Sequence, residues 1–471
     1  MAGQLVAEEL PEPLVGLIGP YLARQRWYAG EGPPGSLKVV TASRYCPDGG
    51  ESCLRWAIVD ADGTEYQIVL AERPASAGTE VLAGHDEVLV GTAGGKRYYD
   101  ATVDPEMSIL LLEVASAGTE QARRARPLVA EQSNTSVIYD DRLILKVFRR
   151  LTMGANPDVE VTSSLAATGF EHVAKPLVRW EGDGRDLAFG QQYLAGGTDG
   201  WALALTSLRD YYGSPDADGP SHPALSGGDF AAEAVRLGEM TGEMHLAMAR
   251  AYTTSDDLAE SWPAFVASLQ EEVGQLGPEL ASSGGPLLER LGGVRSPGLA
   301  VRAHGDYHLG QVMRTDNGWY VLDFEGEPNR PLEQRLEPTS VMKDVAGMLR
   351  SLQYASRFAI GERAEAVTAE LEARAGSWEE RNCAAFIHGY YGTEGISRLL
   401  PHDPEDREAV RVAFELEKAL YELRYERSFR PDWAPIPLAA LRRLLTQPID
   451  VLLAPPEVPP AAPEVPANAD N

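Results

Sequence analysis

The chain has 471 residues, of which 44% are hydrophobic and 24% are charged, so it can bury a sizeable core in two or three structural units. Its 42 basic and 70 acidic residues give a net charge of -28 at pH 7. This charge disfavours nucleic acid and anionic membranes as partners, and a negatively charged ligand must bind in a local pocket. We find no run of about 18 apolar residues that would span a membrane. The acidic N-terminus also lacks the apolar core of a signal peptide.

The three cysteines, Cys46, Cys53 and Cys383, are too few and too irregularly spaced for a disulfide framework or a zinc site. Cys46 and Cys53 could pair across a hairpin, but the simpler interpretation is a chain of free thiols in a reducing compartment. We therefore expect a cytoplasmic protein that acts as a monomer or a small homo-oligomer.

Residues 1–100 combine one short helix with strand-like segments. The helix is expected in PLVGLIGPYLARQRW. The run CLRWAIVDADGTEYQIVLAER alternates apolar and polar residues on both sides of the turn signal DADGT. This pattern predicts a hairpin, and the segment as a whole predicts a small α+β unit.

Residues 101–199 continue the strand-rich pattern. In RPLVAEQSNTSVIYDDRLILKVFRRL, two strand-like runs flank a turn at Asp140 and Asp141, and the second run contains Lys146. A helix is expected to begin at Pro157, with Glu160 one turn in. Taken alone, Lys146 is typical of a surface lysine whose stem packs on the core, and Glu160 is typical of an acid favoured by the helix dipole.

Residues 200–454 are rich in helical patterns. Asp229 is expected to cap a helix in which Phe230, Leu237 and Met244 recur at helical spacing. Further helices are expected in SVMKDVAGMLRSLQYASRF, RNCAAFIHGYYGTEGISRLL and AVRVAFELEKALYELRYERSF. Residues 455–471 are rich in Pro, Ala and acids and predict a disordered tail. A chain that passes from strand-rich to helix-rich predicts an α+β fold with segregated lobes.

The segment from His304 to Pro328 concentrates carboxylates beside a short apolar strand. HGDYHLGQ places Asp306 and Gln311 before a hairpin signal at Asn317–Gly318, and YVLDFEGEP places Asp323 after the second run. The turn would bring Asp306, Gln311 and Asp323 to one end of a ribbon. One carboxylate can then accept a proton from an attacking hydroxyl while the others hold Mg²⁺, which is the arrangement that phosphoryl transfer requires.

The spacing His304-x-Asp306-x-x-x-x-Gln311 resembles the catalytic loop of protein kinases, with Asp323 in the place of the Asp of D-F-G. The wording HGDYHLGQ and DFEGEP resembles the maltokinase-like sugar kinases, which are related to aminoglycoside phosphotransferases. The segments RQRWYAG, EQSNTSV, NPDVE, KDVAGMLRS and RPDWAPIPLAA are also similar to that family, so the resemblance covers most of the chain.

The resemblance implies a bilobal, protein-kinase-like α+β fold that uses ATP and Mg²⁺. It implies an N-terminal cap in residues 1–100, a strand-rich intermediate lobe in 101–199, a helical lobe in 200–454 and a tail in 455–471. Asp306 would be the catalytic base, Lys146 would contact the ATP phosphates and Glu160 would pair with Lys146. The remaining implied residues are Gln311, Asp323 and Glu325 for the metal, Ser133 to Ser136 over the phosphates, and Gln192, Tyr193 and Leu194 at the adenine-binding hinge.

Three histidines need separate interpretations. His304 is expected to steady the catalytic loop and could border the substrate. His308 could bind a metal, but a packing and hydrogen-bonding role is the simpler expectation, and His245 is typical of a core histidine. GDYH also resembles the opening of metallophosphoesterases, which need an Asn-His pair that this sequence lacks. A catalytically inactive kinase-fold binding module is the other alternative, although every carboxylate expected for chemistry is present.

The acceptor is expected to be a small polyol, because no segment resembles the peptide-binding activation segment of protein kinases. After the metal-binding loop, Thr339, Val341, Lys343 and Gln353 replace the Asp, Pro, Arg and Asp of typical maltokinases. These changes favour the glucosamine kinase branch, with glucosamine 6-phosphate as product, over a maltokinase that makes maltose 1-phosphate. No spacing fixes which hydroxyl reacts. The late-helix carboxylates that could pair with a sugar ammonium are Glu415, Glu417, Glu422 and Glu426, of which Glu417 and Glu422 are our candidates.

Overall fold

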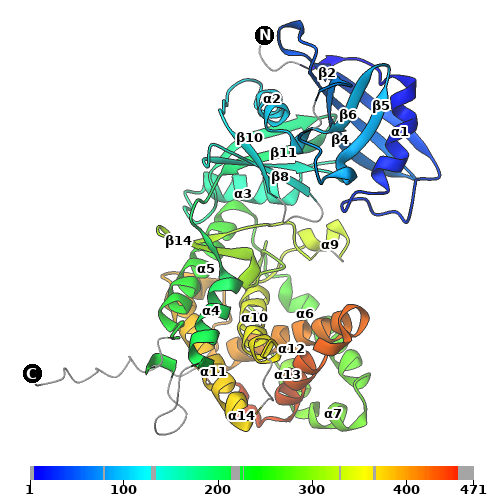
Figure 1. Cartoon of the computed structure of the whole chain (residues 1–471). Helices are drawn as coiled ribbons and strands as arrows, with labels where there is room; N and C mark the ends of the chain where they lie inside the picture. The colour runs from blue at the N-terminus through cyan, green and yellow to red at the C-terminus, as the bar shows by residue number, and fades with distance from the viewer. Residues whose placement is uncertain are drawn as a thin grey trace, which may run out of the picture. The chain divides into compact units, whose positions relative to one another are not determined.

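The computed structural model describes residues 5–77, 80–128, 134–213, 223–225, 228–327, 330–363 and 368–454. The chain forms two compact units, one of Met1–Ser163 with Ala174–Ala195 and one of Ser164–Val173 with Gly196–Asn471. The first unit is rich in antiparallel strands and the second is mostly helical, so the predicted α+β class is confirmed (Figure 1). The finer boundaries expected near residues 100 and 199 stay a prediction.

A six-stranded antiparallel sheet, in the order β1-β2-β3-β4-β6-β5, forms the first part of the first unit. The turn between β3 and β4 lies at Asp62 and Gly63, which both have positive φ, so the predicted DADGT hairpin is confirmed. Helix α1 packs against this sheet with Leu14, Ile18 and Leu22 buried (Figure 1). The elements are β1 (Val6–Ala7), α1 (Glu12–Leu22), β2 (Leu37–Tyr45), β3 (Cys53–Ala61), β4 (Thr64–Pro74), β5 (Leu89–Ala93) and β6 (Lys96–Asp100).

A second, five-stranded antiparallel sheet follows in the order β10-β11-β9-β8-β7. The turn between β8 and β9 is formed by Asp140 and Asp141, both with positive φ, as the sequence predicted. The elements are α2 (Pro105–Ala115), β7 (Ala125–Leu128), β8 (Asn134–Tyr139), β9 (Leu143–Phe148), α3 (Pro157–Ala167), β10 (Pro176–Gly182) and β11 (Arg185–Gln192).

Buried polar contacts join the two sheets of the first unit. The Gln67 side chain on β4 donates to the carbonyl oxygens of Phe148 (3.0 Å) and Leu187 (2.9 Å) in the second sheet. Arg149 forms an ion pair of 2.8 Å with Asp100, and both side chains are almost fully buried. Removing one partner of such a pair leaves an uncompensated buried charge, so this contact is specific to one packing of the two sheets.

Cys46 and Cys53 form a disulfide between the end of β2 and the start of β3. The expectation of a chain with free thiols only is therefore wrong. The hairpin brings the two Cα atoms to 4.4 Å, within bonding range, and the sequence offered only a weak sign of this contact. Cys383 is a free thiol, and its burial raises the pKa.

The second unit contains the helices that the sequence predicted and several short strands. The expected helix in RNCAAFIHGYYGTEGISRLL ends earlier than its pattern suggests, at Gly392, because Thr393 adopts an extended backbone. Asp229, the expected cap, lies one residue before the cap position, which is Phe230 because the helix begins at Ala231. Its carboxylate still accepts a hydrogen bond from Ala231 N (3.1 Å). The helices are α4 (Gly200–Gly213), α5 (Ala231–Ala251), α6 (Leu258–Gly274), α7 (Pro278–Ser283), α8 (Gly285–Gly292), α9 (Leu332–Leu336), α10 (Met342–Gly361), α11 (Ala369–Gly392), α12 (Pro404–Phe429), α13 (Pro435–Thr446) and α14 (Ile449–Leu452), and the strands are β12 (Thr198–Asp199), β13 (Ala300–Val301), β14 (Val312–Thr315), β15 (Gly318–Val321) and β16 (Thr339–Ser340).

Close helix packing builds the body of this unit. α5 lies against α11, and a Cβ atom at Gly389 would stand 2.1 Å from the carbonyl oxygen of Val235, so only glycine fits. α10 packs against α12, which places two segments about 70 residues apart in the sequence side by side. Across the described residues, no helix combines the length and apolarity needed to cross a membrane. The expected disordered tail, 455–471, lies outside the described residues.

Candidate active site

The hairpin of β14 and β15 carries the predicted catalytic segment in the second unit. Val312 pairs with Val321, and Gly318 has a φ of 123°, which confirms the predicted turn at Asn317–Gly318. At the open end, Leu322 N donates to the carbonyl oxygen of Gln311 (2.9 Å), and His304 Nε2 lies 3.0 Å from the carbonyl oxygen of Leu322. The structure thus brings the loop after β13, Gln311 and the residue before Asp323 together.

The loop around Asp306 is anchored by a buried carboxylate at the start of α10. Asp344 accepts hydrogen bonds from the backbone N–H groups of His304 (2.8 Å) and Gly305 (2.9 Å). Its Oδ2 atom also lies 3.1 Å from Nε2 of His245, whose Nδ1 contacts the Tyr390 hydroxyl (2.8 Å). Burial would raise the pKa of Asp344, but these hydrogen bonds and the His245 ring hold it below its usual range. The expected core role of His245 is confirmed.

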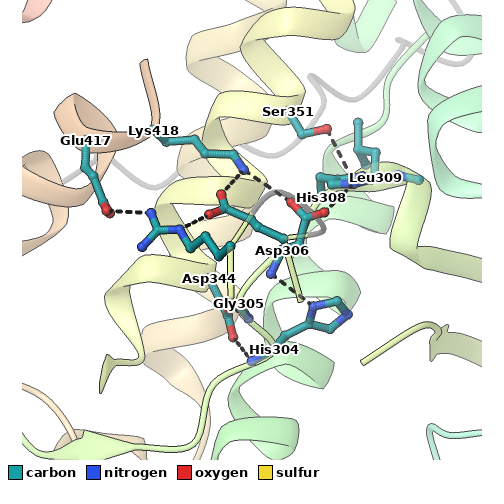
Figure 2. Close-up of polar contacts among 12 residues, drawn as sticks. His304, Gly305, Asp306, His308, Leu309, Asp344, Ser351, Glu417 and Lys418 are labelled. Atoms are coloured by element: carbon teal, nitrogen blue, oxygen red, sulfur yellow. Dashed lines mark hydrogen bonds and ion pairs between the residues drawn. The ribbon is translucent and has the colours of Figure 1, made fainter. Parts of the chain in front are cut away.

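Asp306, the expected base, lies beside Lys418 of α12 (Figure 2). Lys418 Nζ is 3.2 Å from Asp306 Oδ1, and His308 Nε2 is 3.8 Å from Asp306 Oδ2. Burial would raise the pKa of Asp306, but the charges of Lys418, His308 and His304 outweigh it and lower the pKa. The carboxylate is therefore held in its ionised form, the form that can accept a proton. His308 also accepts a hydrogen bond from Gly310 N (3.1 Å), in agreement with its expected hydrogen-bonding role.

The Lys418 ammonium group is part of a chain of ion pairs in which acids and bases alternate. Nζ donates to Glu327 Oε1 (2.9 Å), Glu327 pairs with Arg330, and Arg330 Nη2 reaches Glu417 Oε1 (3.1 Å). Figure 2 shows Lys418 between Asp306 and the neighbouring acid, with Glu417 at the far end of the chain. The three acids of this chain, Asp306, Glu327 and Glu417, are linked through the two cations Lys418 and Arg330.

A cavity of about 240 Å³ lies against this chain of charges. It is bordered by Gly305, next to the expected base, by the charged groups of Glu327, Arg330 and Glu417, and by the aromatic ring of Phe265. A few charged groups beside aromatic surface in a concave site are typical of small-molecule binding.

Asp323 and Glu325 follow β15, as the sequence predicted. Their carboxylate oxygens approach within 4.8 Å of one another. Asp323 has a φ of 59°, an uncommon backbone conformation for a residue other than glycine. Hard carboxylate oxygens at this separation fit a hard divalent cation such as Mg²⁺. The Gln311 side chain forms no hydrogen bond with the residues that the structure describes, and its metal role stays a prediction.

The first unit holds the residues expected to bind nucleotide. Lys146 lies on β9 opposite Ser136 of β8, and its Nζ atom is 3.2 Å from Asp158 Oδ2. The expected partner, Glu160, is therefore corrected to Asp158. Both acids lie in the first turn of α3, but two positions turn the helix by about 200°, so they cannot face the same strand. Ser133 lies outside the described residues.

The expected hinge residues stand at the end of β11, where the chain leaves the first unit. Gln192 N donates to the carbonyl oxygen of Lys175 (2.9 Å), and Tyr193 N donates to that of Arg142 (2.8 Å). Leu194 is half-buried. The adenine-binding role of these residues stays a prediction.

Three of the four late-helix glutamates form contacts with other side chains and do not border the cavity, contrary to the expectation for Glu422. Glu422 pairs with Arg350, which is 1% exposed, and so belongs to the contact between α10 and α12. Glu415 pairs with Arg411, and Glu426 accepts a hydrogen bond from Tyr354. Of the four, only Glu417 borders the cavity.

Sequence reasoning missed Lys418, Asp344, Glu327 and Arg330. Lys418 was visible as a single cation among the glutamates of FELEKALYELRYE, and Asp344 as the acid of KDVAGMLRS. Neither residue is close to Asp306 in the sequence, so no spacing rule could connect them.

The chain is similar to known proteins of one family. Residues 21–104 match the maltokinase N-terminal cap domain. The chain is 30% identical to a glucosamine kinase of Mycolicibacterium smegmatis over 352 residues, or 70% of this chain and 82% of the relative. It is 27% identical to a glucosamine kinase of Streptacidiphilus jiangxiensis over 356 residues, or 71% of this chain and 76% of the relative.

Solved structures agree on the fold. A glucosamine kinase in complex with glucosamine, ADP and inorganic phosphate has a TM-score of 0.59 at 20% identity, covering 93% of this chain and 99% of its own. Another glucosamine kinase structure, crystal form B, has a TM-score of 0.60 at 21% identity, covering 93% of this chain and 100% of its own. The chain therefore belongs to the maltokinase-like sugar kinases, in the glucosamine kinase branch, and is an ATP-dependent phosphotransferase with an alcohol group as acceptor.

Proposed function

We propose that the protein transfers the γ-phosphate of ATP to glucosamine, with Mg²⁺, to give glucosamine 6-phosphate. The observation that carries the acceptor is the cavity beside Gly305, which is bordered by the carboxylates of Glu327 and Glu417. The names of the two relatives support the same sugar. A cytoplasmic location remains part of the proposal, because ATP is the expected donor.

The cavity offers an amino sugar both a charged and an apolar contact. Glu417 is 21% exposed on its side chain, and only its Oε1 atom holds Arg330 among the described residues. Its other oxygen can therefore pair with a sugar ammonium. A buried or half-buried cation needs such a paired anion. Thr339 and Lys343, two of the positions that depart from the maltokinase pattern, also border this cavity.

The chemistry then uses the residues of the loop. The ionised Asp306 accepts the proton of the sugar hydroxyl while the hydroxyl oxygen forms a bond to the γ-phosphorus, and the bond from that phosphorus to the β–γ bridging oxygen breaks to release ADP. Asp323 and Glu325 would hold Mg²⁺, which neutralises phosphate charge when bound. Lys146, held by Asp158, would contact the phosphates.

The test is a panel of glucosamine, glucose, N-acetylglucosamine and maltose, followed by ADP release under identical conditions. We expect kcat/KM for glucosamine to exceed that for glucose by about tenfold or more, since one paired charge is worth roughly 1.4 kcal/mol. N-acetylglucosamine should be poor, because acetylation removes the charge. A clear preference for maltose would favour the maltokinase alternative, which is consistent with the match to the maltokinase cap domain. Sugar-independent ADP release across the panel would overturn both.

A further inference from the structure

The cation nearest to the expected base comes from a distant helix. α12 places Lys418 Nζ 3.2 Å from Asp306 Oδ1 and 2.9 Å from Glu327 Oε1. The side chains of Lys418 and Asp306 are each 19% exposed, and that of Glu327 is 3% exposed. A lysine this far from water needs paired carboxylates, so the contact fixes all three groups relative to one another.

The two oxygens of Asp306 are left in different environments. Oδ1 accepts the hydrogen bond from Lys418. Oδ2 faces His308 at 3.8 Å, beyond hydrogen-bonding distance, and accepts no hydrogen bond from the residues that the structure describes. Oδ2 is therefore the oxygen that can receive a proton from an acceptor hydroxyl.

We propose that Lys418 is a positioning residue for phosphoryl transfer, which holds Asp306 through Oδ1 so that Oδ2 meets the acceptor hydroxyl. Through Glu327, the same ammonium group connects the base to the wall of the sugar cavity. The inference rests on the proposed role of Asp306 as base.

The contact has an electrostatic consequence besides the geometric one. The groups that face Asp306 are Lys418 from α12 and His304 and His308 from its own loop. Of the neighbouring acids, Asp323 acts on His308 and Glu327 acts on Lys418. Among the attractive charges, Lys418 lowers the pKa of Asp306 most strongly. Removal of the Lys418 ammonium should therefore raise the pKa of the base and move the acidic limb of the rate profile to higher pH.

The experiment compares Lys418→Met with Lys418→Arg in the full chain, by steady-state kinetics with varied ATP and varied sugar over a range of pH. We expect Lys418→Met to lower kcat by about 10- to 100-fold, because a misplaced catalytic group costs about that much, with the KM for ATP little changed. The acidic limb of kcat/KM should move up by about one pH unit. Lys418→Arg keeps the positive charge and should recover part of kcat and the wild-type limb.

A purely structural role for Lys418 makes a different prediction, which a double variant tests. Lys418→Met with Glu327→Gln removes one of the two carboxylates that the single variant leaves uncompensated. If Lys418 only balances charge, this double variant should recover kcat at saturating sugar, a readout that is not changed by weaker sugar binding when Glu327 is lost from the cavity wall. If Lys418 positions Asp306, the double variant should regain the stability that the single variant loses, but kcat should stay low and the acidic limb should stay shifted.

Arg424→Met is the matched control, since Arg424 lies on the same helix, is 57% exposed and pairs with Glu272 away from the loop. It should behave like the wild type. Wild-type kcat and pH profile in Lys418→Met would overturn the inference, and so would a raised KM for ATP with unchanged kcat, which would assign Lys418 to nucleotide binding. Full activity of Asp306→Asn would instead overturn the base itself, so the two failures are distinguishable.

Discussion

The carboxylate of Asp344 holds the backbone of His304, with 2.8 Å between Asp344 Oδ2 and His304 N. The other carboxylate oxygen holds Gly305 N, so one buried side chain fixes both residues before Asp306. A second anchor lies further along the loop, where Leu309 N donates to Ser351 Oγ (3.1 Å). Both anchors belong to α10, which makes this helix the support of the catalytic loop.

The first prediction follows from this support. Asp344→Asn removes the charge that two backbone N–H groups and His245 share, so it should lower the free energy of unfolding by about 3 kcal/mol, as for other broken buried pairs. It should also lower kcat, because the loop loses its fixed geometry. Urea unfolding followed by circular dichroism measures the first effect. Asp316→Asn, on the exposed turn of the hairpin, is the control and should stay within about 0.5 kcal/mol of the wild type.

The pH dependence of the free energy of unfolding should also reflect the role of Asp344. The pKa of Asp344 is lower in the folded chain than in the unfolded chain, so its contribution is fully present above the ordinary aspartate pKa of about 3.9 and is lost as the pH falls through the folded value. The stability difference between wild type and Asp344→Asn should therefore be constant from pH 5 upward and shrink below about pH 4. A difference that grew on acidification would contradict the lowered pKa.

Asp306→Asn should abolish most turnover while nucleotide binding survives. The amide cannot accept the hydroxyl proton, and the effect is confined to the transition state, so kcat should fall by about 10²- to 10⁴-fold. Asp323→Asn should give the opposite pattern: nucleotide binding in the presence of Mg²⁺ should be weaker than in the wild type, and binding without Mg²⁺ should change little. Titration calorimetry with ADP, with and without Mg²⁺, separates the two. Near-normal kcat in Asp306→Asn would exclude it as the base.

The ion pair between Lys146 and Asp158 can be tested by comparing Asp158 with Glu160, the other acid in the first turn of α3. Lys146→Met should raise the KM for ATP about tenfold or more, and Asp158→Asn should follow in the same direction because it frees the lysine. Glu160→Gln should have little effect, since this acid faces away from β9 by the helical rotation. Steady-state kinetics with varied ATP measures all three. A larger effect at Glu160 than at Asp158 would restore the original expectation.

Substitutions of two glutamates of α12, Glu417 and Glu422, should have different effects. Glu417→Gln should raise the KM for glucosamine but not for glucose, because the residue borders the cavity. Glu422→Gln should mainly lower the melting temperature, because it leaves the buried Arg350 without its carboxylate. Thermal unfolding and sugar kinetics on both variants distinguish these outcomes. Equal kinetic effects would show that the late helix does not discriminate between sugars.

The sequence alone determined the local features. The turns at Asp62–Gly63, Asp140–Asp141 and Asn317–Gly318 follow from residues that adopt positive φ, and the helices follow from apolar spacing, so each was visible within a short window. The spacing of His304, Asp306 and Gln311, followed by Asp323, also indicated a kinase, because it resembles the catalytic and metal-binding loops of that fold.

Only the tertiary structure decided which charges meet. Lys418 lies 112 positions after Asp306, Asp344 lies 40 positions after His304, and Arg330 reaches Glu417 across 87 positions. Side chains so far apart in the chain become neighbours through the packing of α10 against α12, which depends on complementary surfaces and not on local spacing. The partner of Lys146 was decided in the same way, because the direction of a side chain depends on where a helix begins and how it is rotated against its strand.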